Sequence, residues 1–544
     1  MARTPLFSRL VDTLRLAASD APAREVVDEA AAAHADAVSR RRMLAGMGGT
    51  LAGATVLGCE GGGEPDERIG RREDPIRAVS ASIGIVGAGI AGLACAYELK
   101  RAKCTATIHE GSSRIGGRIW SMGGSFPGPV MFPGQVVERG GELIDTPHKA
   151  TLAYAREFGL ALEDVAKPKR DTFYFFGGTS IPEATMVEEY RVLVAAMKKD
   201  LLQVGSPTAQ AFTPADQALD FMSLRQYLES RGAPTHIKNL LNVAYAIEYG
   251  VETDQQSCLA FLLFTKASRQ SKLRLWGNSS DERYHLTSGN EAIPRAIAAK
   301  LPGQIKLGRK LVRAKKTAAG RVELTFVEGA KTVTATHDAV VLAIPFNLLR
   351  EVELDASLAL PAWKKYAIQN SRYGTNAKLM VGFTGQPWVD LGGNGAVYTD
   401  LPRLQAAWET NPANADATRG VLTDYAGGNL GVSLDPAKVQ LETASFLAAY
   451  DRAVPGALAK ARRDASGKYV AHLEHWPTSP WTRGSYTANQ PGYFTTLADN
   501  EGRAVGNLYF AGETTDSFYS WQGFMEGGCL SGHRAAGEIV RDLG

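Results

Sequence analysis

The sequence predicts an α/β protein built around a Rossmann-like βαβ unit. A short apolar strand over residues 83–86 runs directly into glycines in GxGxxG spacing, and a helix follows to about Arg101. A second strand over 104–109 then ends at Glu110, and this complete order is far more specific than the glycines alone. The 544-residue chain is 44% hydrophobic and 22% charged. Such a composition suits a folded protein of two or three domains, or one large composite one.

Each glycine of the turn has its own physical role. Gly87 permits the tight turn, Gly89 lets the backbone approach a pyrophosphate, and Gly92 lets the helix pack closely on the strand. The first amides of the helix point at the same place. Glu110 stands where an acid accepts the ribose hydroxyls. The turn therefore predicts a dinucleotide site, and the alternative is a plain βαβ core without a ligand.

Charge and cysteine usage exclude several other classes. Lys and Arg total 60 against 57 Asp and Glu, a net charge of +3, and the body of the chain has no basic run. We therefore expect no nucleic-acid partner. The five cysteines are scattered without a CxxC pair, so neither a zinc site nor a disulfide framework is expected. We also find no sequence cluster typical of a metal site and no Ser/His/Asp triad. The composition is compatible with an oligomer as well as a monomer.

The first 77 residues differ from the rest. The stretch SRRRMLAGMGGTLAGATVLGC, residues 39–59, resembles a twin-arginine export signal, which the Tat export machinery reads. Its end, VLGC, also resembles a lipoprotein processing box with Cys59 as a lipid anchor. Residues 60–77 form a polar Gly/Pro/charge linker. We expect an exported protein, periplasmic or anchored as a lipoprotein on the outer side of the inner membrane; the alternative is an Arg-rich start of an ordinary helix.

A second glycine-rich segment follows Glu110 and distinguishes between dinucleotides. With its GSSRIGGRIWS segment (residues 111–121), the chain resembles the flavin amine oxidase family of monoamine, polyamine and L-amino-acid oxidases, in which R-x-GGR completes an FAD pyrophosphate site. The resemblance continues through VVERGGELID (136–145), ERYHLTSGNEAIPRAIAAKL (282–301), DAVVLAIPFNLL (338–349), GNLYFAGETT (506–515) and WQGFMEGGCLSGHRAAGEI (521–539). The resemblance rests on motifs that occur in the same order over some 450 residues. Members of this family act on many different substrates.

The resemblance implies the architecture: an FAD-binding Rossmann-like domain of the glutathione-reductase type, interleaved with an α+β substrate-binding domain. The FAD-binding domain would comprise 78–165, 283–370 and 478–544, and the substrate-binding domain 166–282 and 371–477. FAD would contact Gly87, Gly89, Ile90, Ala91, Gly92, Glu110, Gly111, Arg114, Gly117, Arg118, Gly140, Gly141, Glu142, Leu311, Gly512, Glu513, Gly523, Phe524 and Met525.

The C-terminal segment makes physical sense by itself. A buried strand over 508–511, a turn at Gly512-Glu513 and a helix over 525–540 rich in small residues form a strand–turn–helix unit. The helix N-terminus would direct amides and a partial positive charge at the flavin N1/C2 carbonyl. The alternative is a βα unit with only a packing role.

Aromatic residues in HWPTSPWTRGSY, residues 475–486, are spaced by five, which fits neither a helix nor a strand. In the family this segment lies over the flavin. Tyr486 matches the tyrosine that forms one wall of an aromatic cage in this family. Phe524 stands where monoamine oxidases have a second tyrosine, which forms the other wall. Ser485 occupies the place of a cysteine that can bond to the flavin, so we expect non-covalent FAD. Trp476 would pack near the flavin; the alternative is a loop that packs its rings on a core.

Lys378, within the apolar stretch TNAKLMVGF, matches a lysine that holds a water at flavin N5. A lysine in an apolar strand is costly without a purpose. The alternative is an edge-strand lysine that reaches solvent. Flavin would perform the redox chemistry, while the protein binds, orients and excludes water.

The sequence constrains the identity of the substrate less than that of the cofactor. Ile144 stands where L-amino-acid oxidases carry an Arg that clamps the substrate carboxylate, although Arg139 or Arg372 could substitute. Asp281 matches a cavity-lining polar position of monoamine oxidases, where a carboxylate could hold a distal ammonium group of the substrate. The alternative is that Asp281 is an acid of a surface loop without a role in binding. Trp521 is expected beside the substrate. A primary amine or polyamine is favoured over a basic L-amino acid, with O2 or an electron carrier as acceptor.

Two alternative hypotheses assign the chain a function other than that of an oxidase. An NAD-dependent dehydrogenase would need a second nucleotide site, and the sequence has only one GxGxxG. A non-catalytic flavoprotein would be expected to lack Lys378 or the aromatic cage. The sequence therefore favours an oxidase.

Overall fold

The computed structural model describes residues 81–544, except 131, 166–170, 268–281, 413–415 and 517–520. The predicted export signal, Cys59 and the linker lie outside the described residues. Within the described ranges, no helix is both long and apolar enough to cross a membrane.

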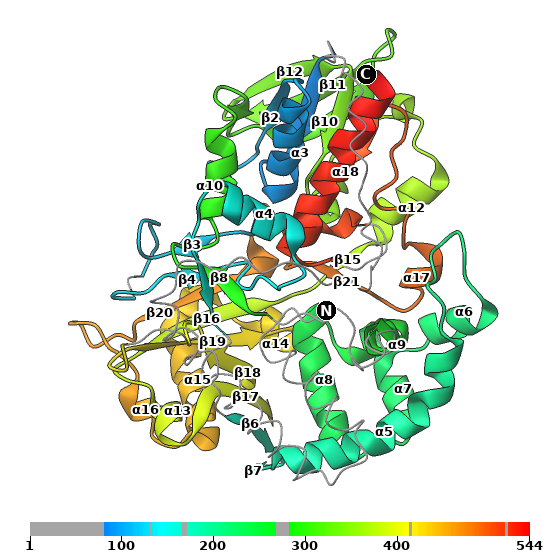
Figure 1. Ribbon diagram of the computed structural model, residues 1–544. Helices are drawn as coiled ribbons and strands as arrows, with labels where there is room; N and C mark the ends of the chain where they lie inside the picture. Colours follow the sequence, from blue (N-terminus) through cyan, green and yellow to red (C-terminus); the bar gives the residue numbers. More distant parts are fainter. Residues whose placement is uncertain (1–80, 131, 166–170, 268–281, 413–415, 517–520) are drawn as a thin grey trace, which may run out of the picture.

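A five-stranded parallel sheet forms the centre of the upper half of the molecule in Figure 1. Its strands, in spatial order, are β22 (Leu508–Phe510), β13 (Ala339–Leu342), β1 (Ile83–Val86), β2 (Ala106–His109) and β9 (Ile305–Lys306). They come from three distant stretches of chain. All four residues of β1 and β13 are buried, as expected for strands covered on both faces.

Helices cover one face of this sheet and a second sheet covers the other. Helices α3 (Ile90–Arg101) and α18 (Met525–Leu543) lie side by side on one face (Figure 1). The other face packs on a four-stranded sheet. Its strands are β10 (Lys310–Lys316), β11 (Val322–Glu328), β12 (Lys331–His337) and β14 (Glu353–Leu354).

Three of the expected element boundaries shift. The second strand begins at Ala106 rather than Cys104, the C-terminal strand ends at Phe510 rather than Ala511, and the last helix continues to Leu543 rather than Val540. The ends of an element are the part that local sequence specifies least well.

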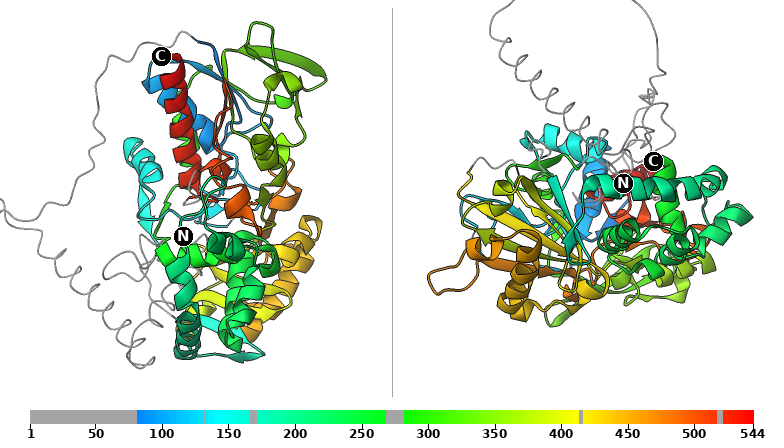
Figure 2. Two further views of the ribbon diagram at one scale, coloured as in Figure 1. Left: turned by 90° about the vertical axis from the view of Figure 1, so that its right-hand side faces the viewer. Right: turned by 90° about the horizontal axis from the view of Figure 1, so that it is seen from below.

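The lower half contains a seven-stranded sheet (Figures 1 and 2). Its strands, in spatial order, are β20 (Ala471–His475), β16 (Ala377–Phe383), β19 (Gly420–Ala426), β18 (Leu404–Glu409), β17 (Gly393–Leu401), β6 (Asp171–Phe176) and β7 (Thr179–Ser180). Five helices pack on one face, namely α5 (Glu183–Gln203), α6 (Pro214–Asp220), α7 (Leu224–Ser230), α8 (Thr235–Tyr249) and α9 (Cys258–Ala267). Helix α15 (Val439–Ala453) covers the other face.

Side-chain alternation decides what each strand of this sheet presents to its two faces. In β17, Tyr398 packs with helices α5 to α9, whereas Val397 packs with α15. In β16, Leu379 and Val381 also pack on the α15 side. Lys378 therefore points to the opposite face.

Candidate functional site

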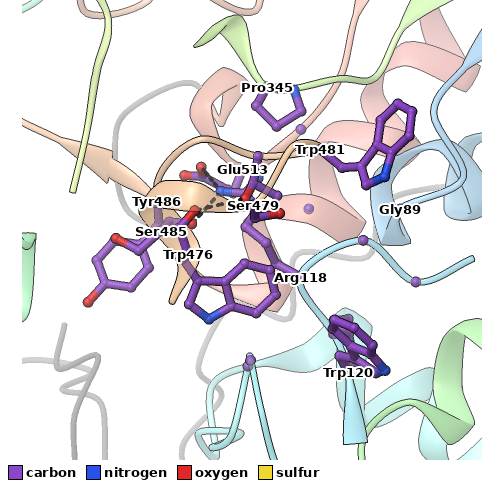
Figure 3. Close-up of a pocket in the computed structure, with 18 of the residues that line it drawn as sticks. Gly89, Arg118, Trp120, Pro345, Trp476, Ser479, Trp481, Ser485, Tyr486 and Glu513 are labelled. Carbon is purple, nitrogen blue, oxygen red and sulfur yellow. Dashed lines mark hydrogen bonds and ion pairs between the residues drawn. The ribbon is translucent and has the colours of Figure 1, made fainter. Parts of the chain in front are cut away.

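A cavity of about 760 Å³ lies between the two halves of the molecule. Its wall includes the carboxyl ends of β1 and β13, the start of α18, and residues of β16, β18 and β19. Ligands of open parallel sheets bind at this carboxyl edge. The segment 476–486 closes one side (Figure 3). Every residue predicted to contact the dinucleotide lines this cavity, with the exception of Gly92.

Gly92 has a packing role instead. A Cβ built on it would lie 2.0 Å from the carbonyl oxygen of Gly87, so only glycine lets α3 approach β1 this closely. Gly140 is equally constrained, because its Cβ would lie 1.8 Å from the carbonyl oxygen of Arg118. By contrast, a Cβ on Gly89 would meet only the Cα of Gly117, at 3.9 Å, and would otherwise project into open space. Gly89 thus leaves a cradle that a side chain would fill.

The glycine turn is arranged for an anionic ligand. Helix α3 begins after Gly89 without a side-chain cap, so its first amides remain available. Both oxygens of Glu110 accept from backbone amides, one from Ala88 at 2.7 Å and one from Ser112 at 2.8 Å. The carboxylate is thereby fixed at the end of β2, with lone pairs left for ribose hydroxyls. The donors and acceptors of this end fit a dinucleotide.

The start of α18 forms the opposite wall. Phe524 is its N-cap and provides no side-chain cap, which leaves amides available there also. Glu513 links three segments: it pairs with Arg118 at 2.8 Å and accepts from the Thr487 hydroxyl at 2.8 Å and the Gly523 amide at 2.7 Å. This carboxylate therefore holds the R-x-GGR segment, the aromatic segment and the turn before α18 together.

Lys378 lies on an internal strand, since β16 is bonded to β20 on one side and β19 on the other. Its ammonium donates to Glu142 Oε2 at 2.5 Å and to the carbonyl oxygens of Glu138 at 2.7 Å and Gly140 at 3.2 Å. The side chain is 4% exposed and lines the cavity. The edge-strand alternative is therefore wrong.

The aromatic residues of segment 475–486 occupy different parts of the cavity (Figure 3). Trp476 is buried, and its indole N–H donates to the Arg139 carbonyl at 3.1 Å. Trp481 lies against Gly111, where an added Cβ would be 2.5 Å from the indole ring. Tyr486 donates to the Ile247 carbonyl at 3.2 Å. Ser485 also lines the cavity, with its hydroxyl 2.5 Å from Asn376 Oδ1.

Among the cavity aromatics that the sequence did not indicate are Trp408 on β18 and Tyr425 on β19. The Trp408 indole N–H donates to Glu142 Oε1 at 3.0 Å, and the Tyr425 hydroxyl lies 2.9 Å from that of Tyr486. Tyr425 stands directly opposite Lys378 in the sheet register, so both side chains leave the same face. The alternation of side chains along these strands indicates which residues share a face of the sheet. It does not indicate which strands pair, so the sequence could not place these two rings in the cavity.

Two residues predicted to contact the substrate do not line the cavity. Ile144 exchanges backbone hydrogen bonds with Tyr284, at 2.6 and 2.9 Å, and its side chain is fully buried in the core around α3. Trp521 packs edge-on against Phe524, with ring centroids 5.9 Å apart, and supports that ring from behind the wall. Asp281 lies outside the described residues.

Of the two candidate replacements for an arginine clamp, Arg139 lines the cavity but is already paired, and Arg372 lies in a different cavity. The Arg139 guanidinium pairs with Glu474 at 2.5 Å and stacks 3.2 Å from the Trp120 ring centroid. Arg372 is exposed and lines a separate surface cavity with Arg350.

Acidic residues that the sequence reading had not singled out line the cavity as well. Asp145 is fully buried, and Glu282 is 5% exposed. Burial, followed by repulsion from Asp145, raises the pKa of Glu282 well above its ordinary value. His148, next to Asp145, has its pKa lowered to about 3 by burial and is therefore neutral.

Comparison with known proteins agrees with this geometry. The family model described as flavin-containing amine oxidoreductase matches residues 90–540. A pseudooxynicotine dehydrogenase of a Pseudomonas species is 24% identical over 533 residues, covering 93% of this chain and 97% of that protein. An L-amino-acid oxidase of Demansia vestigiata is 24% identical over 482 residues, covering 84% and 86%. A putative flavin-containing monoamine oxidase of Mycobacterium tuberculosis is 24% identical over 469 residues, covering 85% and 97%.

Solved structures show the same fold. Cyclohexylamine oxidase from Brevibacterium oxydans superposes with a TM-score of 0.71 at 21% identity, covering 85% of this chain and 99% of that one. Wild-type putrescine oxidase bound to putrescine gives a TM-score of 0.69, with the same identity and coverage. The predicted fold class is confirmed.

Proposed function

The chain belongs to the flavin-containing amine oxidoreductases, and from this we propose that it oxidises a primary amine or polyamine with O2 as acceptor. Hydride leaves the carbon beside the nitrogen, and the resulting imine is hydrolysed to a carbonyl compound and ammonia while O2 becomes H2O2. FAD supplies the two-electron acceptor when bound. The protein's own contribution is to bind, orient and exclude water.

The single observation that supports this proposal most strongly is the position of Lys378. Its ammonium is buried in the cavity wall, where it bonds to Glu142 and to the backbone of the second glycine pair. A lysine so placed presents a fixed positive charge beside the expected reaction centre. Tyr486, Phe524 and Trp476 supply apolar ring surface around the same space. Such rings accept a neutral amine and exclude water.

A primary amine is favoured over an amino acid because a carboxylate needs a cationic partner. Arg139 is held by Glu474 and Trp120, and Arg372 lines a different cavity. Neither supports a bidentate clamp of the kind that orients a substrate carboxylate. A basic L-amino acid remains the second candidate, because a relative similar over 84% of the chain is named an L-amino-acid oxidase.

The acceptor is also part of the proposal. A relative that matches 93% of this chain is named a dehydrogenase, which favours an electron carrier as the alternative to O2. Peroxide formed in step with amine loss would support O2. Turnover that requires an added carrier would support the dehydrogenase.

We further propose that the chain is exported through the twin-arginine route and acts outside the inner membrane. The basis is the sequence from Ser39 to Cys59, which combines consecutive arginines with a mild apolar stretch and a terminal cysteine.

A panel of amines and L-amino acids, added without oxygen, tests the function. Bleaching of the yellow protein by primary amines is the expected result. Bleaching by L-amino acids alone would replace amines as the substrate class, and an unchanged spectrum with every compound would contradict a catalytic role.

A further inference from the structure

Glu282 is a buried carboxylic acid inside the cavity that forms no hydrogen bond through either side-chain oxygen, as far as the described residues extend. It stands two residues before β8 (Tyr284–Leu286), where the chain returns toward the parallel sheet. A buried carboxyl group normally has partners, and each exception calls for an explanation. The amine oxidation proposed above does not use it.

The backbone of Glu282 is also unusual. Its φ is +42°, in the left-handed region that residues with a side chain rarely adopt. The amide of Glu282 donates to Asp145 Oδ1 at 2.7 Å, which holds this conformation. Strained residues that are held by their surroundings gather at ligand sites.

The charged groups that act on Glu282 among the described residues are acids. Asp145, Glu248 and Glu142 all raise its pKa, after the larger effect of burial. Glu142 already has Lys378 as its counter-ion, and the neighbouring His148 is neutral. This end of the cavity consequently favours a cation, and Lys378, the cation beside these acids, is already paired with Glu142.

A short chain of contacts connects Glu282 with the aromatic wall. Asp145 receives the Glu282 amide and lies 3.2 Å from His148 Nε2. The His148 ring then packs edge-on against Phe524, with centroids 5.2 Å apart. The acid and the ring therefore belong to one continuous wall. A substrate with its reacting nitrogen near the rings can extend its other end toward Glu282.

We propose that Glu282 binds the second cationic group of a dibasic amine, so that diamines or polyamines are the preferred substrates of this site. The inference rests on the proposed amine oxidation. In the free protein, burial and the neighbouring acids disfavour the carboxylate form of Glu282 and raise its pKa. A bound ammonium or guanidinium then stabilises the carboxylate, and the proton of Glu282 passes to solvent.

Three related compounds separate the candidate substrates: pentylamine, 1,5-diaminopentane and L-lysine, which is 1,5-diaminopentane with a carboxylate on one amine-bearing carbon. Only the last two have a second cation, and only L-lysine has a carboxylate. We expect the highest kcat/KM for 1,5-diaminopentane. An equal or higher value for pentylamine overturns the inference while leaving amine oxidation intact. A highest value for L-lysine overturns the diamine assignment. If none of the three compounds nor any other amine bleaches the protein, the proposed function itself fails.

Replacing the acid tests its role directly. Glu282→Gln keeps the shape and removes the ionisable group, so the ratio of kcat/KM for 1,5-diaminopentane to that for pentylamine should fall by about 30-fold or more. Glu282→Asp retains a carboxylate and should restore part of that ratio. Glu163→Gln is the matched control: Glu163 lies on β5 (Leu162–Asp164), which pairs antiparallel with β8, and it pairs with His285 and does not line the cavity. It should leave the ratio unchanged, and equal losses for both amines in Glu282→Gln would contradict the proposal.

Proton release gives a second readout that needs no turnover. Pentylguanidinium carries the distal cation without an oxidisable amine. Calorimetry in buffers of different ionisation enthalpy should show about one proton released on binding to the parent protein and none with Glu282→Gln. Equal affinity of the parent protein and Glu282→Gln for pentylguanidinium would show that Glu282 does not meet the cation. If both Glu282 variants fail to fold, the substrate order and proton count of the parent protein decide the matter.

Discussion

Lys378 and Glu142 form a buried ion pair, with Nζ and Oε2 2.5 Å apart and side chains only 4% and 8% exposed. The residues are 236 positions apart in the chain. The pair joins β16 of the substrate-side sheet to the second glycine pair of the dinucleotide site. It therefore fixes the two halves of the cavity relative to each other.

Removal of Lys378 should affect both stability and chemistry. Lys378→Met leaves Glu142 buried without its cation, which should cost about 3–5 kcal/mol of unfolding free energy. Lys378→Met combined with Glu142→Gln should recover part of that loss in denaturant titrations. In stopped flow, the single variant should slow reoxidation by oxygen about tenfold, equivalent to about 1.4 kcal/mol, and slow reduction by amine less. Unaltered reoxidation would leave Lys378 with a structural role alone.

Gly92 should tolerate no side chain. Gly92→Ala places a Cβ 2.0 Å from the Gly87 carbonyl oxygen, so α3 must move away from β1. We expect lost FAD and a lowered Tm, measured by absorbance and thermal unfolding. Gly537→Ala is the control, because it is an exposed helical glycine with no atom within 4 Å of the added Cβ. That change should stabilise the protein by about 0.5–1 kcal/mol. Normal FAD content in Gly92→Ala would contradict the packing argument.

FAD should be released by denaturation. Ser485 lies in the cavity wall with its hydroxyl bonded to Asn376, and a serine offers no thiol for a thioether link. Acid precipitation should leave the yellow colour in the supernatant. Colour retained by the pellet would indicate a covalent link through another residue.

The buried acid Glu138 should make the protein less stable as pH rises. Burial raises the pKa of Glu138 to about 7, although the Asn290 amide and the Ser121 hydroxyl both donate to it. The folded state then holds a proton that the unfolded state releases near pH 4.5. Its stabilising contribution is complete below about pH 4.5 and is lost as pH rises through about 7. The shift from 4.5 to about 7 corresponds to at most about 3 kcal/mol.

Glu138→Gln tests this dependence. Its unfolding free energy between pH 4.5 and pH 8 should fall less steeply than that of the parent protein, as followed by denaturant titration. An identical slope in the two proteins would show that Glu138 titrates normally in the folded state.

Export should depend on the consecutive arginines. Replacing Arg40 and Arg41 by Lys keeps the charge but removes the pattern that the twin-arginine machinery reads. We expect the protein to remain in the cytoplasm, as measured by cell fractionation. Unchanged export would remove the twin-arginine interpretation.

Local sequence was sufficient to predict an element wherever the interactions that form it lie within one short segment. The strand, glycine turn, helix and acid of residues 83–110 are contiguous, so the geometry of the turn follows from the residue types. The C-terminal strand and helix could be identified for the same reason. Lys378 attracted attention because a lysine within an apolar strand has an evident cost.

Residue identity alone could not establish the partners of those segments. Ile144 was expected near the substrate because it matches the position of an arginine in L-amino-acid oxidases, but a backbone bridge to Tyr284 turns it into the core. Glu142 lines the cavity together with the other predicted cofactor contacts, and its carboxylate also bonds to Lys378 and to Trp408, two partners that the sequence did not indicate. Each of these contacts joins residues more than a hundred positions apart.

The sequence by itself determined the fold class, because glycine spacing and apolar strands act locally, and its resemblance to the flavin amine oxidases indicated the family and FAD. Only the tertiary structure decided which acid faces the substrate space. Glu282 became visible through its burial, its strained backbone and the absence of a hydrogen-bond partner among the described residues. The groups that act on Glu282, among them Asp145 and Glu248, come from separate parts of the chain. No local pattern therefore records how they pack together.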